Sequence, residues 1–279
     1  MSNSINTNIK ALMASNAMAL NGRAQQMTME SLSTGKRINR ASDDSAGLSI
    51  RETMTSQIKG LNVAVRNAND GISLLETADA GLSETSSMLQ RMRELAVLSR
   101  TDTYSSVQKA ALNDEYAQLL SQVDKIASNT QWNGTSILDG TGGAAGTSAT
   151  FEFQIGANAA DTYDVVISAM QASTLGSIDG TSINSAGGAS DAISALDVAL
   201  STLNSQRSII GSAVNRLTHA VDNLTLAAQT ASESRSKVED TDYAAATSDL
   251  ARQQIIQQAA TAILAQANQQ QQSVLSLLK

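Results

Sequence analysis

The chain contains no cysteine and no proline among its 279 residues, and aromatic residues make up only 3% of it. The lack of cysteine excludes disulfides, thiolate chemistry and cysteine-based metal sites. The lack of proline removes the residue that most often kinks or ends a helix, and so few aromatics cannot fill a conventional globular core. These absences favour long, unkinked helices.

The sequence is also poor in groups that catalyse or bind charged partners. His219 is the only histidine, and it should face solvent because it lies two positions beyond the nearest residue of an apolar repeat. The net charge of −7 and the lack of a basic stripe argue against a nucleic-acid surface. The uncharged segment 253–278 holds nine glutamines, so we expect no membrane insertion. We therefore predict no enzyme activity, cofactor or metal.

The most regular pattern in the chain is an apolar repeat from Ile193 to Ala231. Apolar residues recur alternately every three and four positions, and only Arg207 interrupts them. This spacing keeps one narrow stripe of a helix facing a partner, as in a coiled coil. At about 1.5 Å per residue the helix would be roughly 58 Å long, so it needs other helices beside it.

Four further regions carry helical spacing. One covers residues 4–34 and ends at Gly35, a second reaches about residue 99 before a capping box at Ser105 and Gln108 opens a third helix, and the last begins at Asp242. The second region contains Gly60, Gly71 and Gly81, each costing about 1 kcal/mol in a helix relative to alanine. We expect close neighbours to pack at these glycines.

Strand-like alternation appears only near the middle of the chain. Phe151, Phe153 and Ile155 alternate with polar residues, and Val165 and Ile167 repeat the pattern. Segments 139–150 and 171–190 are rich in small residues and are expected to be loops with little to bury. The predicted fold is mainly α, a long-helix bundle with a terminal coiled coil and a small β-hairpin at about residues 132–170.

We expect the two ends of the chain to pair with each other. In this scheme residues 1–42 and 237–279 are the two halves of an inner coiled-coil domain, and residues 43–236 form a core helical-bundle domain that carries the hairpin. An acidic group at Glu239, Asp240 and Asp242 precedes the last helix. It suits helix capping better than a divalent cation, because carboxylates complement the dipole there.

Several long motifs, in order, make nearly the whole chain resemble the bacterial flagellins. Those of the first half are INTNIKAL, LSTGKRINRASDDSAGLSI and NANDGISLLETADAGL, and those of the second half are VNRLTHAVDNL, SRSKVEDTDYA and AILAQANQQQQSVLSLLK. Larger members carry variable outer domains, whereas here only a loop of about residues 168–190 occupies that place. The chain therefore resembles a short flagellin.

The resemblance implies a structural subunit that self-assembles into the hollow flagellar filament outside the cell and transmits motor torque for swimming. It also implies export in an unfolded state by the flagellar type III apparatus. The implied partners are other copies of the chain, the flagellar cap and hook-junction proteins, an export chaperone and the vertebrate Toll-like receptor for flagellin.

The resemblance also points to two groups of residues. The first, in and near the QRMRELA stretch, is a candidate subunit interface and receptor-recognition surface comprising Gln90, Arg91, Leu95 and Glu115. The second is an assembly seam on the terminal helices comprising Ile5, Ile9, Leu12, Leu20, Ile256, Ile263, Val274 and Leu278.

Two other functions fit parts of the pattern. A protein of the hook–filament junction shares the terminal design, although VLSLLK and QRMRELA favour flagellin itself. A helical signalling coiled coil is a weaker alternative, because it would need a membrane span or a partner domain.

Overall fold

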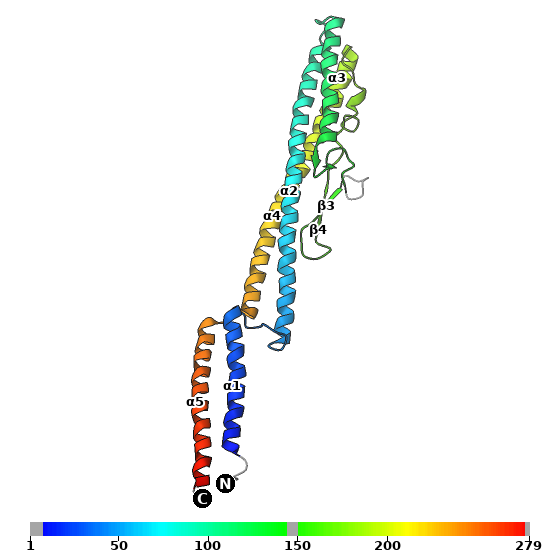
Figure 1. Ribbon diagram of the computed structural model, residues 1–279. Coiled ribbons are helices and arrows are strands. Elements are labelled where there is room, and N and C mark those ends of the chain that lie inside the picture. Colours follow the sequence, from blue (N-terminus) through cyan, green and yellow to red (C-terminus); the bar gives the residue numbers. More distant parts are fainter. Residues whose placement is uncertain (1–7, 144–149, 277–279) are drawn as a thin grey trace. The chain divides into compact units, whose positions relative to one another are not determined.

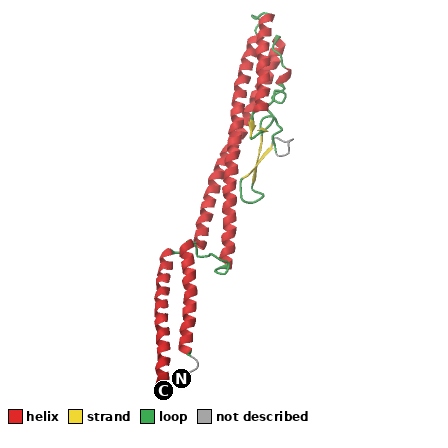
Figure 2. Ribbon diagram, viewed as in Figure 1, coloured by secondary structure: helices red, strands yellow, loops and turns green. Residues whose placement is uncertain are grey.

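A computed structural model describes residues 8–143 and 150–276, with side chains described up to residue 270. These residues form five α-helices, a short 3-10 helix and four strands (Figures 1 and 2). The α-helices are α1 (Ile9–Thr34), α2 (Ser45–Arg100), α3 (Ser106–Asn129), α4 (Ala186–Glu239) and α5 (Tyr243–Ser276). The prediction of a mainly α fold built from long helices is confirmed.

Local capping signals set the helix ends where the sequence predicts them. Ser105 Oγ accepts a hydrogen bond from the Gln108 amide, and the Gln108 side chain accepts one from the Ser105 amide, which completes the capping box of α3. Gly35 ends α1 with φ of 70°, a left-handed conformation that glycine adopts without strain. Asp44 Oδ1 accepts bonds from the amides of Ala46 and Gly47 at the start of α2.

The chain divides into two compact units, residues 57–229 and residues 1–56 with 230–279. In the first unit, α2, α3 and α4 enclose the main core. The apolar repeat of α4 is buried as predicted, at Leu196, Leu203, Ile210 and Leu217. At its one interruption, Arg207 Nε lies 2.8 Å from Asp79 Oδ1 on α2, so the break in the apolar stripe carries an ion pair between helices.

Two small antiparallel hairpins stand beside these helices. β1 (Gln131–Trp132) pairs with β2 (Thr135–Ser136) through Asn133 and Gly134, whose φ angles of 49° and 78° are both positive. Positive φ at both central positions is what a tight type I′ turn requires. β3 (Thr150–Gln154) pairs with β4 (Thr162–Val166), which confirms the predicted hairpin.

The glycines of α2 provide space for the hairpin region. A Cβ atom at Gly71 would lie 2.9 Å from Phe153 Cδ1, and one at Gly81 would lie 3.0 Å from Leu138 Cδ1. Both distances are shorter than normal carbon–carbon contacts. The expectation that close neighbours pack on these glycines is confirmed.

The segment before α4 differs from the prediction of a loop with little to bury. Leu175, Ile178 and Ile183 are fully buried, and Ile178 is the first residue of the 3-10 helix η1 (Ile178–Gly180). α4 also begins at Ala186, within the segment 171–190 that was expected to be a loop. The three apolar residues follow no regular period, because an irregular segment buries them against several elements at once.

In the second unit α1 and α5 lie side by side, which confirms that the two ends of the chain pair (Figure 1). The predicted domain boundaries after residues 42 and 236 fall within this unit, which includes the beginning of α2 and the end of α4. The division into terminal and core domains at those positions stays a prediction.

Candidate functional site

The faces that α1 and α5 turn to each other carry fully buried alanines, polar side chains and four half-buried larger apolar residues: Met18, Leu32, Leu250 and Leu264. The buried apolar side chains on the two helices are alanines: Ala14, Ala246, Ala260 and Ala267. Asn21 Nδ2 donates to the Gln253 carbonyl at 2.8 Å and to Gln257 Oε1 at 3.2 Å, and Gln253 Nε2 donates to Thr28 Oγ1 at 3.1 Å. Polar groups within a helix pair fix register more than they add stability.

The larger apolar side chains of the predicted assembly seam lie elsewhere on these helices. Ile9, Leu20 and Ile263 are 59%, 61% and 57% exposed, and Leu12 and Ile256 are exposed as well. They therefore do not form the contact between α1 and α5. Ile5, Leu278 and the side chain of Val274 lie outside the described residues.

Four of the exposed apolar residues of α1 share one face of the helix. Ile9, Met13, Leu20 and Met27 follow one another at steps of four, seven and seven residues. At about 100° per residue these steps keep the four side chains within a narrow outer stripe. Ala14, Asn21 and Thr28, which face α5, lie roughly a third of a turn away. The outer stripe is thus exposed within the described part of the chain.

Between α1 and α2, the connector is held against the end of α4. Gly35 O accepts from the Thr241 amide at 3.0 Å, and the Arg37 amide donates to Glu239 O at 2.6 Å. Ile38 is 1% exposed, so it anchors the connector by burial. These contacts join the segment that follows α1 to the segment that precedes α5.

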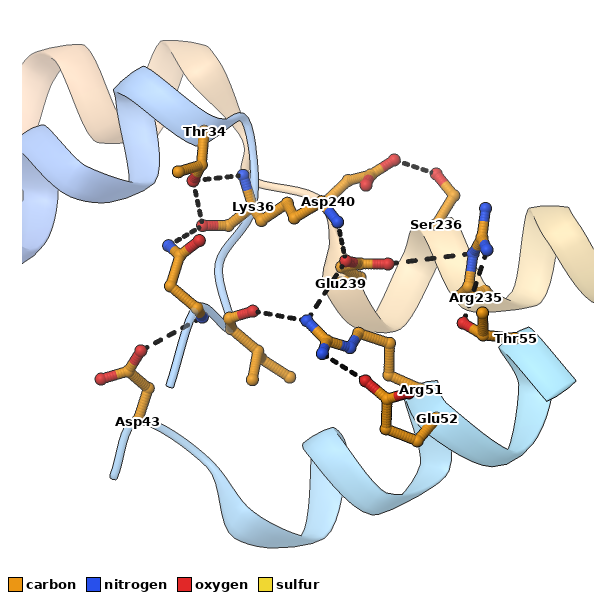
Figure 3. Close-up of polar contacts among 12 residues, drawn as sticks. Thr34, Lys36, Asp43, Arg51, Glu52, Thr55, Arg235, Ser236, Glu239 and Asp240 are labelled. Carbon is orange, nitrogen blue, oxygen red and sulfur yellow. Dashed lines mark hydrogen bonds and ion pairs between the residues drawn. The ribbon is translucent and has the colours of Figure 1, made fainter. Parts of the chain in front are cut away.

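Four charged residues form a junction cluster at this connector: Lys36, Arg51, Arg235 and Glu239 (Figure 3). The side chain of Glu239 is only 7% exposed, and it forms ion pairs with Lys36, Arg51 and Arg235. A buried carboxylate requires such compensation, because leaving it unpaired costs several kcal/mol. The hydrogen bond with Glu52, followed by the charges of Glu52 and Glu239, raises the pKa of Arg51 despite some desolvation.

The acidic residues near position 240 thus have structural partners. Asp242 Oδ1 accepts from the amides of Ala244 and Ala245, which confirms the predicted capping of α5. Asp240 accepts a hydrogen bond from Ser236. Within residues 8–143 and 150–276, histidine, aspartate and glutamate side chains form no cluster suited to a metal ion.

The candidate interface around Arg91 lies in the other unit. Arg91 spans α2 and α3, with its Nη2 2.9 Å from Glu115 Oε1 and its Nη1 3.0 Å from Glu94 Oε2. The hydrogen bonds with Glu115 and Glu94 raise the pKa of Arg91. Gln90 is exposed beside it. The three residues Gln90, Arg91 and Glu115 therefore form one exposed lateral patch.

Leu95 does not lie on this patch, although it was predicted with it. Its side chain is fully buried in the core, because it occupies a position of the apolar repeat of α2. Val97 and Leu98, which lie two and three residues after Leu95 on α2, are exposed. Together with Gln90, Arg93 and Glu94 they line a shallow depression, and Arg93 Nε also lies 2.8 Å from Asp197 Oδ1 on α4.

No helix in the described part of the chain has a run of residues apolar and long enough to cross a membrane.

Two family descriptions together match most of the chain. Residues 5–142 match the bacterial flagellin N-terminal helical region, and residues 193–278 match the bacterial flagellin C-terminal helical region. The stretch between them contains the β3–β4 hairpin and the segment that precedes α4.

Individual relatives match from end to end. A flagellin of Halalkalibacterium halodurans is 41% identical over 276 residues, and a flagellin of Bacillus subtilis is 39% identical over 302 residues. Each alignment covers 99% of this chain and 99% of the relative. The crystal structure of Bacillus cereus flagellin is 34% identical with a TM-score of 0.51, and the match covers 57% of this chain and 88% of that one.

Proposed function

Because the chain belongs to the bacterial flagellin family, we propose that the exposed apolar faces of α1 and α5 are the surfaces through which its copies join. The protein is a structural subunit of the flagellar filament, which lies outside the cell and serves motility, and it is not an enzyme. Polymerisation follows from membership of the family. The residues that drive it are the subject of the proposal.

One observation carries the proposal: the apolar side chains that the terminal helices bury fully are alanines, and several of their larger apolar side chains lie in water. Ile9, Leu20, Ile256 and Ile263 are all exposed. An exposed stripe of large apolar residues marks an interaction surface. A filament also needs contacts that repeat without closing, which such a stripe provides when it meets a different face of the next copy. Ile5, Val274 and Leu278 belong to the same proposed assembly seam.

The experiment places a charge within this surface. Ile263→Asp should abolish filament growth, because a carboxylate buried between subunits lacks a partner. Gln258→Asp, an exposed substitution on the same helix, is the matched control and should polymerise normally. Sedimentation measures the polymer, and circular dichroism of the free subunit should show equal helix content in both variants. Normal polymerisation of Ile263→Asp contradicts the proposal, and so does a loss of helix in the free subunit.

We also propose that the lateral patch of Gln90, Arg91 and Glu115 takes part in contacts between neighbouring subunits and in recognition by the vertebrate Toll-like receptor. Its exposure and its charged groups on two helices support this. Leu95 can act there only from beneath, by holding α2 in place. Arg91→Asp should abolish receptor signalling by the monomer and weaken lateral packing, whereas the exposed variant Arg100→Asp should leave both unchanged.

A charge swap separates the proposed contact from the stability of the patch. Arg91→Glu combined with Glu115→Arg restores an ion pair between α2 and α3 but reverses the charges offered to a partner. Signalling and filament stability should stay lost in the double variant. Recovery of both would show that the ion pair serves only the fold of the subunit.

The remaining partners belong to the same proposal. We propose that the chain leaves the cell unfolded through the flagellar type III apparatus, attended by an export chaperone, and joins the filament between the hook-junction and cap proteins. The contact between α1 and α5 supports this, because a pair whose fully buried apolar side chains are alanines gains little from burial and opens easily. The alternatives of a junction protein or a signalling coiled coil have no comparable observation in their favour.

A further inference from the structure

All sulfur in this chain is thioether sulfur. The sequence has nine methionines and no cysteine, so two-electron oxidants that attack sulfur can react only with methionine. Four of the nine lie in the 26 residues of α1, at positions 13, 18, 27 and 29. The helix that we propose as an assembly surface is therefore also where the oxidisable groups gather.

Exposure separates these methionines sharply. Met13, Met27 and Met29 are 68%, 59% and 54% exposed, whereas Met92 and Met170 in the core of the other unit are 0% and 1% exposed. Oxidation of methionine follows access to the sulfur. The exposed residues should react at least about tenfold faster than Met92 and Met170, which an oxidant reaches only through local opening.

Position then separates the exposed methionines from one another. Met13 and Met27 are members of the outer stripe, with Ile9 and Leu20 beside them. Met29 is equally open but points away from the stripe, because two residues along a helix turn a side chain by roughly 200°. Oxidation of all three exposed side chains should therefore matter only at two of them.

We infer that Met13 and Met27 form an oxidation-sensitive site that controls whether subunits can join. A hydroperoxide transfers one oxygen atom to the thioether, which becomes a sulfoxide, and the O–O bond breaks to leave water or an alcohol. The inference rests on the proposed function, because it requires the outer stripe to be covered by another copy of the chain.

The sulfoxide changes the stripe from apolar to polar. Its oxygen is a strong hydrogen-bond acceptor, and burying it between subunits without a donor is unfavourable. Each oxidised side chain should weaken subunit joining by about tenfold. The change is reversible, because a methionine sulfoxide reductase returns the thioether and water while two thiols are oxidised to a disulfide.

The experiment treats free subunits with hydrogen peroxide, maps sulfoxides by mass spectrometry and follows filament growth by sedimentation. The wild-type chain should carry sulfoxide at Met13, Met27 and Met29 but not at Met92 or Met170, and its polymerisation should fall by about tenfold or more. Treatment with the reductase should restore growth. An unchanged yield with full oxidation at Met13 and Met27 overturns the inference.

Two variants test position against exposure. In Met13→Leu/Met27→Leu the yield after peroxide, divided by the yield of the same variant without peroxide, should stay near one. In Met29→Leu the same ratio should fall as in the wild type. Protection by Met29→Leu, or none from the double substitution, contradicts the site.

The Ile263→Asp variant and the peroxide-treated wild-type chain together separate this inference from the proposed function. Failure of Ile263→Asp to prevent growth would remove the assembly seam itself. Loss of growth in Ile263→Asp together with peroxide-resistant growth of the wild type would remove only the oxidation site.

Discussion

The hydroxyl of Tyr116 shows how single residues hold the irregular segment before α4. Thr181 Oγ1 uses its hydrogen to donate to Ile178 O at 2.7 Å, so the Tyr116 hydroxyl must donate the 2.6 Å bond that joins it to Thr181 Oγ1. Burial raises the pKa of Tyr116. The neutral phenol is thus the form that the fold requires.

Tyr116→Phe should lower the free energy of unfolding by about 0.5–1.5 kcal/mol at neutral pH, because it removes one hydrogen bond. The folded-state pKa lies above the ordinary value near 10, so this stabilisation is complete below pH 10 and is lost as the pH rises through the folded-state pKa. Denaturant unfolding at several pH values should therefore show a steeper alkaline loss in the wild type than in Tyr116→Phe. Parallel pH profiles would contradict the assigned donor.

In the terminal unit, the buried side chain of Glu239 helps to hold the connector between α1 and α2. Glu239→Gln leaves Lys36, Arg51 and Arg235 without their shared carboxylate, and should destabilise the connector by about 1–3 kcal/mol, since the cations remain partly exposed. Hydrogen exchange at the amides of Arg37 and Thr241, which bind the connector, should speed up by roughly tenfold or more. Asp249→Asn, on an exposed ion pair of α5, is the control and should leave both amides unchanged.

The sequence predicts residue roles well where the cause is local. Ser105, Gly35 and Asp242 act on backbone groups within a few positions, so their spacing alone identified them. Glu239 gave no comparable signal, because two of its three partners lie about two hundred residues away. The family resemblance places Leu95 on the surface, but its place in an apolar repeat of α2 predicts the burial that the structure shows.

Among the helices, α2 packs most closely on the hairpin at its glycines, and a single substitution tests this packing. Gly71→Ala adds a Cβ atom that meets the Phe153 ring, so it should destabilise the core unit by about 1–3 kcal/mol despite the better helix propensity of alanine. Gly211→Ala in α4 has nothing within 4 Å of the added atom and should stabilise by up to about 1 kcal/mol. Thermal unfolding of the two variants should shift in opposite directions, and shifts of the same sign would contradict the packing.

The long helices and the β3–β4 hairpin could be predicted because their periods extend over many residues. The segment from residue 171 could not, since Leu175, Ile178 and Ile183 are separated by glycine and serine and follow neither helical nor strand spacing. The pairing of α1 with α5 was also predictable, but the residues that make it were not. The rule that large apolar side chains face the partner holds only in part here, because alanine and amide side chains share that face with half-buried leucines, while Ile9 and Ile263 are exposed.

For the molecule as a whole, the two units have different chemistry. Residues 57–229 enclose a large apolar core, whereas the apolar side chains that the described part of the terminal unit buries fully are Ile38 and alanines, and many of its larger ones are exposed. The core unit should therefore be stable in the free subunit, and the terminal unit should depend on contacts with other copies. Limited proteolysis should remove the ends and leave a resistant fragment of about residues 57–229. Equal resistance of both units would contradict this division.

Side-chain footprinting tests whether the exposed faces of the terminal helices join the copies of the chain. Hydroxyl radicals would label the free subunit and the assembled filament in parallel, and mass spectrometry would compare Ile9, Leu20, Ile256 and Ile263, with Leu82 of the core as the unreactive reference. We predict that labelling of these four residues falls by about tenfold or more on assembly, because another copy covers them. Equal labelling in subunit and filament would show that the exposed faces of the terminal helices do not join the copies.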